Sequence, residues 1–142
     1  MSCYQLIYSS RPKVEVTESL VSEILSQAIS RNNSLHISGL LIYFHGMFMQ
    51  LIEGDKTAVD ELFNSIQLDQ RHGDISVLLQ KRSEQRCMPT WLMGFSMDNE
   101  FSNQLEKQGS YIPFEEAKEI CSLMPIEVGK LFLDFMNDAQ GR

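Results

Sequence analysis

Two apolar runs separated by a dipeptide constrain the fold of this chain more than any other feature. The runs cover Ile37 to Phe44 and Met47 to Glu53, and only His45-Gly46 lies between them. Two residues is the length of a tight hairpin turn, so the runs are predicted to be neighbouring antiparallel strands. Gly39 in the first strand marks a bend or a close approach of another backbone. We therefore expect an antiparallel-rich sheet.

A helix is predicted on each side of this hairpin. The first extends from about Glu18 to Arg31, with Thr17 as N-cap and Asn32-Asn33 as residues that tolerate the left-handed conformation at a helix end. The second extends from about Lys56 to Leu68, with Asp55 as its cap. Each helix has an apolar stripe that is expected to be buried. The stripe residues are Leu20, Val21, Ile24, Leu25 and Ala28 in the first helix, and Val59, Leu62, Phe63 and Ile66 in the second.

Three further strands complete this part of the chain. They are predicted over Cys3 to Ser9, over roughly Ile75 to Gln80, and over Trp91 to Met97, where every odd position is large and apolar. The order βαββαββ over about 97 residues matches a ferredoxin-like sandwich, in which two helices cover one face of the sheet. The predicted fold class is α+β.

Two short helices are predicted at the C-terminus. One opens at Pro113, and the second opens at Met124-Pro125, with Pro125 in the favoured first helical position. The second helix has an apolar stripe that must be buried, and the sheet face left bare by the two main helices is the expected place. Its residues are Val128, Leu131, Phe132, Phe135 and Met136. We therefore expect a sandwich domain over residues 1–98 and a helical extension over 99–142.

Composition excludes several classes of function. The net charge is −7, and the basic residues form no stripe, so direct nucleic-acid binding is not expected. Cys3, Cys87 and Cys121 are odd in number and lack CxxC spacing, which argues against a disulfide framework or a zinc site. No stretch approaches the roughly 20 apolar residues that span a bilayer. These features predict a cytoplasmic protein that is not attached to a membrane.

A few residues are candidates for a binding site, although each also has an ordinary structural role. Gln50 shares a strand face with apolar neighbours, and an unsatisfied buried amide costs about 1–3 kcal/mol, so protein groups or a ligand must satisfy it. Taken singly, Tyr8 is a core tyrosine whose hydroxyl reaches water, and Asn32 is a helix cap. Trp91 and Met93 are core residues on the same reasoning.

The combination of these residues carries more information than any one of them. Blocks of sequence around them, in this order and spacing, resemble the BLUF family, the blue-light sensors that use FAD. The resemblance covers about residues 2 to 97. The blocks are Leu6–Ser10, Asn32 with Ile37–Leu41, Phe48–Gly54, Asp69–His72 and Trp91–Met93.

The resemblance implies that the isoalloxazine ring of FAD lies between the two main helices, against Ile24 and Phe48. It places Tyr8 and Gln50 at the reactive end, where the excited flavin draws an electron and a proton from the tyrosine and the glutamine rotates or tautomerises. The implied cofactor-binding residues are Tyr8, Ile24, Arg31, Asn32, Phe48, Gln50, Asp69, His72 and Met93. The implied photoactive residues are Tyr8, Gln50, Trp91 and Met93.

Two aspects of the implied site stay open. Trp91 and Met93 match the family's alternating pair, which passes the change at the glutamine to the sheet and the terminal helices, but the sequence does not decide which of them faces the flavin. Relatives often carry a serine at Ala28 and an arginine or histidine at Ser65, so this chain is expected to have weaker polar contacts near the pocket.

Two other functions are compatible with a sandwich of this kind. A regulatory module that binds a metabolite without photochemistry is the main alternative. A phosphate-handling hydrolase is less favoured, because Ser9 to Lys13 has no glycine and Pro12 removes an N–H donor from the expected phosphate cradle. We expect no enzyme activity, and signalling through self-association or a separate protein partner.

Overall fold

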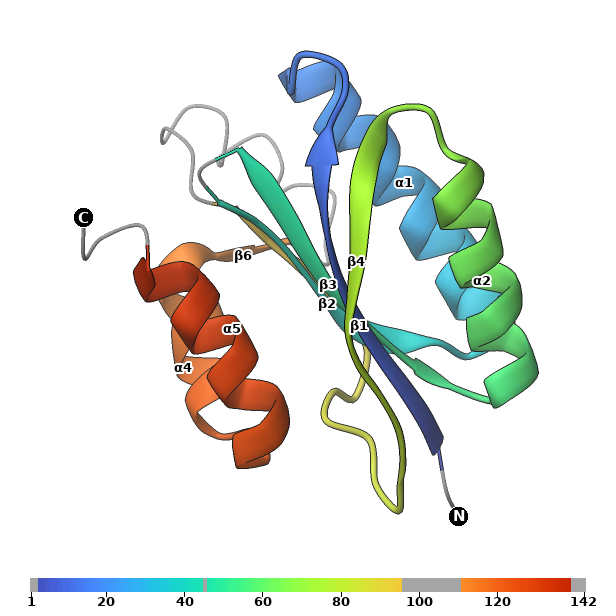
Figure 1. Cartoon of the computed structure of the whole chain (residues 1–142), viewed down its shortest axis with the longest axis vertical. Coiled ribbons are helices and arrows are strands. Elements are labelled where there is room, and N and C mark those ends of the chain that lie inside the picture. The colour runs from blue at the N-terminus through green and yellow to red at the C-terminus, as the bar shows by residue number, and fades with distance from the viewer. Residues whose placement is uncertain (1–2, 45, 96–110, 139–142) are drawn as a thin grey trace.

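The structure is a computed structural model, and it describes residues 3–44, 46–95 and 111–138 (Figure 1). The first part of the chain forms β1 (Cys3–Pro12), α1 (Glu18–Leu35), β2 (Ser38–Phe44), β3 (Met47–Gly54), α2 (Lys56–Leu68), β4 (His72–Ser83) and β5 (Trp91–Phe95). The last part forms β6 (Tyr111–Pro113), α4 (Phe114–Ser122) and α5 (Ile126–Asp138).

The described strands form one sheet in the order β4-β1-β3-β2-β5-β6. The first four strands pair antiparallel, with β1 and β3 at the centre, while β5 joins β2 and β6 joins β5 in parallel. Helices α1 and α2 lie on one side of the sheet, and α4 and α5 lie on the other (Figure 1). The predicted ferredoxin-like α+β fold is therefore confirmed, including the terminal helices on the opposite face.

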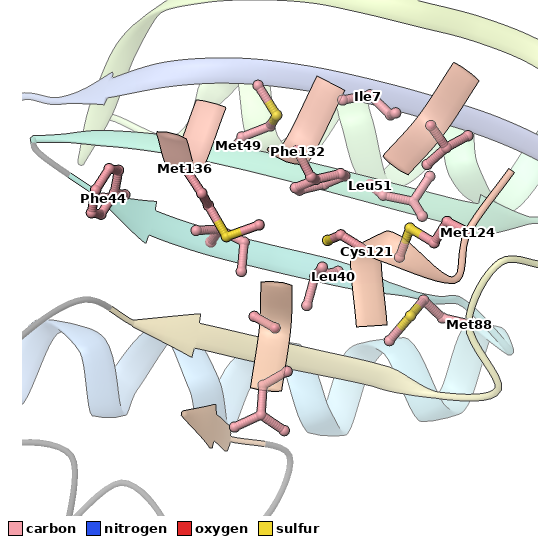
Figure 2. Packing of buried hydrophobic residues seen from close by; sticks show 14 residues of the cluster. Ile7, Leu40, Phe44, Met49, Leu51, Met88, Cys121, Met124, Phe132 and Met136 are labelled. Carbon is pink, nitrogen blue, oxygen red and sulfur yellow. The ribbon is translucent and has the colours of Figure 1, made fainter. Parts of the chain in front are cut away.

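Alternation along β3 divides its side chains between two apolar layers. Phe48 and Ile52 contribute to the layers beneath α1 and α2, whereas Met49 and Leu51 contribute to the layer beneath α4 and α5. Figure 2 shows this second layer, where Phe132 of α5 packs with no exposed surface among residues of β1, β2 and β3. Both faces of the central strands are thus buried, and the polar side chains of β3 are buried with them.

Local capping explains where the main helices begin. The Thr17 hydroxyl accepts from the Leu20 backbone N–H at 3.2 Å, and an Asp55 carboxylate oxygen accepts from the Thr57 N–H at 3.2 Å. Both predicted N-caps are confirmed, and α2 has the predicted bounds. Gly39 is also confirmed as a close approach, since a Cβ there would lie 1.9 Å from the Leu51 carbonyl oxygen.

The predicted end of α1 is wrong. The helix continues past Asn32-Asn33 to Leu35, and His36 adopts the left-handed conformation with φ 56°. Its backbone N–H turns back toward the last carbonyls of the helix, and the Ile37 N–H donates to the Asn32 carbonyl at 2.9 Å. Burial of the Asn32 side chain inside the last turns prevailed over the tendency of asparagine to end a helix.

Other boundaries differ because of pairing that the sequence pattern did not reveal. Strand β4 is longer than predicted, since it pairs with β1 from Ser83 back to His72, and its polar composition is that of an edge strand. The short strand β6 was not predicted. Pro125 lies just before α5, where its carbonyl accepts from the Gly129 N–H at 2.9 Å, so it caps the helix instead of occupying the first helical position. His45 in the hairpin turn, and Ser96 and Met97 at the end of the predicted last strand, lie outside the described residues.

The described residues also bear on the membrane and cysteine predictions. None of the helices in residues 3–44, 46–95 and 111–138 is long and apolar enough to cross a membrane. Cys3, Cys87 and Cys121 are free thiols.

Candidate functional site

A cleft opens between α1, α2 and the sheet face that these helices cover. Its lining combines apolar side chains from α1 and the central strands with polar side chains from β1, α1 and the turn after α2. The lining residues are Tyr8, Ser10, Leu20, Ile24, Gln27, Ala28, Arg31, Leu41, Phe48, Gln50, Ser65, Ile66, Asp69, Arg71, His72 and Trp91. Apolar and polar residues contribute about equally to this lining, and a concave site with converging polar groups is typical of a small-molecule site.

Three side chains at the floor of this cleft form a continuous hydrogen-bonded chain. The Gln50 side-chain amide donates from Nε2 to the Tyr8 hydroxyl at 2.5 Å, and its Oε1 accepts from the Trp91 indole Nε1 at 3.1 Å. Tyr8 and Gln50 are direct partners in the register of β1 and β3, which brings their side chains together. All three residues are at least 94% buried, so water does not compete for these bonds.

Trp91 determines the orientation of the Gln50 amide. An indole N–H can only donate, so the amide oxygen must face Trp91 and the amide NH₂ must face Tyr8. The Tyr8 hydroxyl accepts from that NH₂, and its own proton is therefore not committed to Gln50. Rotation of the amide by half a turn would place two donors against each other at Trp91.

Tyr8 is held in its neutral form. Burial raises the pKa of Tyr8 far above its usual value, and the hydrogen bond from Gln50 and the charge of Arg31 offset only part of that rise. A buried phenolate is therefore strongly disfavoured.

Asn32 is a buried amide with an unfilled donor. Its side chain is 1% exposed, and Nδ2 has no hydrogen-bond partner within the residues that the structure describes. Only a long bond at 3.5 Å, from Arg31 Nε to Asn32 Oδ1, involves the other end of the amide. An orphaned buried donor costs about 1–3 kcal/mol, which an acceptor on a bound ligand would recover. Asn32 is not among the residues that line the cleft, although Ala28, one helical turn earlier, is.

Arg71 connects the turn after α2 to α1 across the cleft. Its guanidinium donates to both Asp69 oxygens, at 2.6 to 3.0 Å, and to Glu23 at 3.2 Å and Gln27 at 3.1 Å on α1. These bonds from Arg71 lower the pKa of Asp69 below its usual value. The cleft volume is about 80 Å³ with this bridge in place. This volume is smaller than the roughly 300–1,000 Å³ of a typical small-molecule pocket.

His72 is fixed at the base of the same turn. Its Nε2 lies 2.7 Å from the Ile66 carbonyl oxygen, and its Nδ1 lies 2.7 Å from the Ser10 hydroxyl. A carbonyl can only accept, so Nε2 carries the proton, and a neutral ring accepts from Ser10 at Nδ1. Both ring nitrogens are thus used to join α2 and β1 beside the cleft.

Most of the residues singled out from the sequence lie together here. Those that line the cleft are Tyr8, Ile24, Arg31, Phe48, Gln50, Asp69, His72 and Trp91. Asn32 lines a separate hollow, together with Ser38, Arg86 and Thr90, and the side chain of Met93 is outside what the structure describes. Ala28 and Ser65, the two departures from the family pattern, also line the cleft.

Several lining residues were missed by sequence reasoning. They are Ser10, Leu20, Gln27, Leu41, Ile66 and Arg71. Arg71 and Ser10 lie within the blocks of family resemblance, so a residue-by-residue reading of those blocks would have found them. Gln27 lies on α1 one turn before Arg31. It lines the cleft as the acceptor of a hydrogen bond from Arg71, which only the tertiary structure reveals.

Comparison with known proteins gives a consistent result. The family described as sensors of blue-light using FAD, BLUF, matches residues 3–94. The dark-state structure of BlrB, described as a BLUF protein, is 31% identical with a TM-score of 0.63, and the match covers 76% of this chain and 84% of that one. The ground state of BlsA is 26% identical with a TM-score of 0.65, and the match covers 94% of this chain and 87% of that one.

The curated relatives are much longer proteins. The photoactivated adenylate cyclase subunit beta of Euglena longa is 33% identical over 84 residues, which make up 59% of this chain and 10% of that relative. The subunit alpha of Euglena gracilis is also 33% identical, over 57% of this chain and 8% of its own length. The chain thus spans about a tenth of the length of the curated relatives that it matches.

Proposed function

Because this chain belongs to the BLUF family of blue-light sensors that use FAD, we propose that it is a photoreceptor in which light reverses the hydrogen bonding of Gln50. The observation that carries this proposal is the buried chain from Tyr8 through Gln50 to Trp91. A phenol, an amide that can exchange donor and acceptor, and an indole that can only donate form a switch with two distinguishable arrangements.

The residues around the cleft fit a flavin cofactor. Ile24 and Phe48 supply apolar surface for a planar ring, and the orphaned Nδ2 of Asn32 supplies a donor for a ring oxygen. Arg31 would contact the polar parts of the cofactor. Asp69 and His72 also line the cleft and belong to the proposed binding set, although Arg71 occupies the Asp69 carboxylate and both His72 ring nitrogens have partners. Met93 completes the proposed binding set on the strength of the family resemblance. Opening of the Arg71 bridge would admit the ring.

Tyr8 is the proposed donor in the light reaction. When bound, the flavin supplies absorption of blue light and accepts one electron and one proton. Tyr8 loses an electron and its phenolic proton together, because burial disfavours a charged phenol, and regains both when the resting redox state returns. No net oxidation or reduction remains at the end of this sequence.

Gln50 is the proposed bistable element. Rotation of its amide turns Oε1 toward Tyr8 and NH₂ toward Trp91, so the Tyr8 hydroxyl becomes the donor and the Trp91 bond is lost. Tautomerisation in place would likewise put an O–H group opposite the indole. Rotation leaves Trp91 without its acceptor, whereas tautomerisation weakens the acceptor, and the resulting displacement of Trp91 would be the signal.

The signal is proposed to leave through protein contacts. Helices α4 and α5 cover the other face of the same central strands and are the nearest route outward. A second copy of this chain or a separate protein would receive the change at these helices. We assign no catalytic activity to this chain.

An absorption spectrum in darkness, under blue light and during recovery tests the proposal. We expect a flavin spectrum that shifts reversibly to the red without bleaching, and release of FAD on denaturation. A colourless protein that cannot be reconstituted with FAD would refute it and favour a metabolite-binding module. Bleaching without a red shift would show a different flavin chemistry.

A further inference from the structure

A buried carboxylate lies three residues beyond Gln50 on the opposite face of β3. Glu53 has no exposed surface, and its odd separation from Gln50 directs it away from the cleft, toward the side that α4 and α5 cover. A carboxylate is rarely buried completely unless other groups satisfy it. The proposed light reaction does not use Glu53, so its burial requires another explanation.

Four donors converge on this carboxylate. Two come from strands adjacent to β3, where the Gln5 amide donates to Oε1 at 2.9 Å and the Ser38 hydroxyl donates to Oε2 at 3.1 Å. Two come from the segment before β5, where the Cys87 N–H donates to Oε1 at 2.9 Å and the Met88 N–H donates to Oε2 at 2.7 Å. An ionised carboxylate only accepts, and each of its oxygens here receives two bonds. Glu53 therefore joins the segment before β5 to β1, β2 and β3, and we call these four hydrogen bonds the Glu53 clamp.

The clamped segment connects both sides of the sheet. The side chain of Met88 is 2% exposed and packs in the same layer as Cys121 and Met124 of the C-terminal helical region (Figure 2). Three residues later, Trp91 lies on the other side, with its indole on Gln50. The segment is also tied to β2, since the Thr90 carbonyl accepts from the Gly39 N–H at 3.2 Å. A short stretch of backbone between Met88 and Trp91 therefore links the indole to the layer beneath α4 and α5.

We propose that Glu53 is a positioning residue that fixes residues 86–90, so that displacement of Trp91 is passed through Met88 to α4 and α5. The inference rests on the proposed function, because it takes the change at Gln50 as the origin of the displacement. With the clamp intact, the segment moves as one body when the indole moves. When the bonds to Glu53 are weakened, residues 86–90 adjust locally as Trp91 moves, and α4 and α5 do not respond.

The substitution Glu53→Gln tests the clamp with little change in volume. Whichever way the new amide is oriented, its NH₂ faces one of the two backbone N–H groups, of Cys87 or Met88, and that donor loses its partner. The chain has one tryptophan, so 5-fluorotryptophan labels Trp91 alone and its ¹⁹F resonance reports the indole position in darkness. Amide hydrogen exchange of α4 and α5 in light and in darkness reports transfer of the signal.

We expect E53Q to retain flavin and the red shift, to show a displaced or broadened ¹⁹F resonance, and to have a smaller light-dependent change in exchange at α4 and α5. A reduction of about twofold or more is expected, since one ordinary hydrogen bond corresponds to that factor or more in an equilibrium. Glu61→Gln serves as the control, because it makes the same chemical change at an exposed carboxylate of α2.

The outcomes separate this inference from the proposed function. An unchanged ¹⁹F resonance in E53Q overturns the inference, and so does an undiminished light response of α4 and α5. A wild-type chain that shows the red shift but no light response in these helices also overturns it. Absence of the red shift in the wild type refutes the proposed function, while the dark ¹⁹F comparison still decides whether Glu53 positions Trp91. If E53Q does not fold, Ser38→Ala removes one donor to Glu53 and must displace or broaden the ¹⁹F resonance of the wild type, and an unchanged resonance in Ser38→Ala then overturns the inference.

Discussion

Replacement of Trp91 by phenylalanine should release the Gln50 amide from its single orientation. The substitution keeps an aromatic ring in the layer under α1 and removes only the indole donor and part of the ring volume. With Trp91 present, the rotated amide loses a hydrogen bond worth about 0.5–1.5 kcal/mol and leaves a buried donor unsatisfied, which costs about 1–3 kcal/mol. The preference is then about 1.5–4.5 kcal/mol, so the rotated form is below roughly ten per cent in darkness.

Without the indole, only the contact with Tyr8 distinguishes the two orientations. A tyrosine hydroxyl can donate or accept, so it discriminates weakly between an amide oxygen and an NH₂ group. We therefore expect both orientations to be populated in Trp91→Phe in darkness, with a dark absorption maximum displaced toward that of the illuminated wild type. The light-driven red shift should be retained but reduced in size.

Side-chain amide NMR with ¹⁵N-labelled glutamine, recorded in darkness, detects the two orientations of the Gln50 amide directly. The wild type should give one pair of Gln50 amide resonances, and Trp91→Phe should give two pairs or one exchange-broadened pair. A single sharp pair in Trp91→Phe, with an unchanged dark absorption maximum, would show that Trp91 does not set the amide orientation. Complete loss of bound flavin would instead make Trp91 a packing residue.

Other predictions concern the donor, the cofactor and the fold. Tyr8→Phe should abolish the reversible red shift while Tyr4→Phe, on the same strand and face, leaves it intact; a normal shift in Tyr8→Phe contradicts the assigned light reaction. Gln50→Leu should also remove the shift, measured in the same way. Asn32→Ala should weaken FAD retention by roughly fivefold to a hundredfold, for a lost bond of about 1–3 kcal/mol, and unchanged affinity in a flavin titration would exclude Asn32 from the site. Phe132→Ala should lower the free energy of unfolding by about 3–5 kcal/mol in urea denaturation, and a loss below about 1 kcal/mol would show that α5 is not part of the cooperative core.

Periodicity and capping made much of this fold predictable. The bounds of α2 follow from Asp55 and from a regular apolar stripe, both of which are local properties of the sequence. The end of α1 was not predictable in the same way. Asn32 is a favourable residue at a helix end, but here its side chain is buried, and packing prevailed over local propensity.

The full length of β4 and the position of β6 depend on hydrogen bonds with distant strands. Residues 72–74 and 81–83 have no strand-like alternation, and they extend because the ladder with β1 continues past both ends of the predicted segment. Similarly, the three residues of β6 form a strand only because β5 offers a free edge. Contacts of this range leave no period in the sequence.

For the site, the sequence by itself determined which chemical groups are present and on which strand faces they lie. Taken singly, Tyr8, Gln50 and Trp91 had ordinary structural roles, and the resemblance of the sequence blocks around them to the BLUF family identified them as candidates. Only the tertiary structure decided that Trp91 donates to Gln50, that Arg71 bridges the cleft, and that Glu53 clamps the segment before β5. The physical reason is that side-chain direction follows from local backbone geometry, whereas hydrogen-bond partners come from segments that are brought together by the packing of the whole chain.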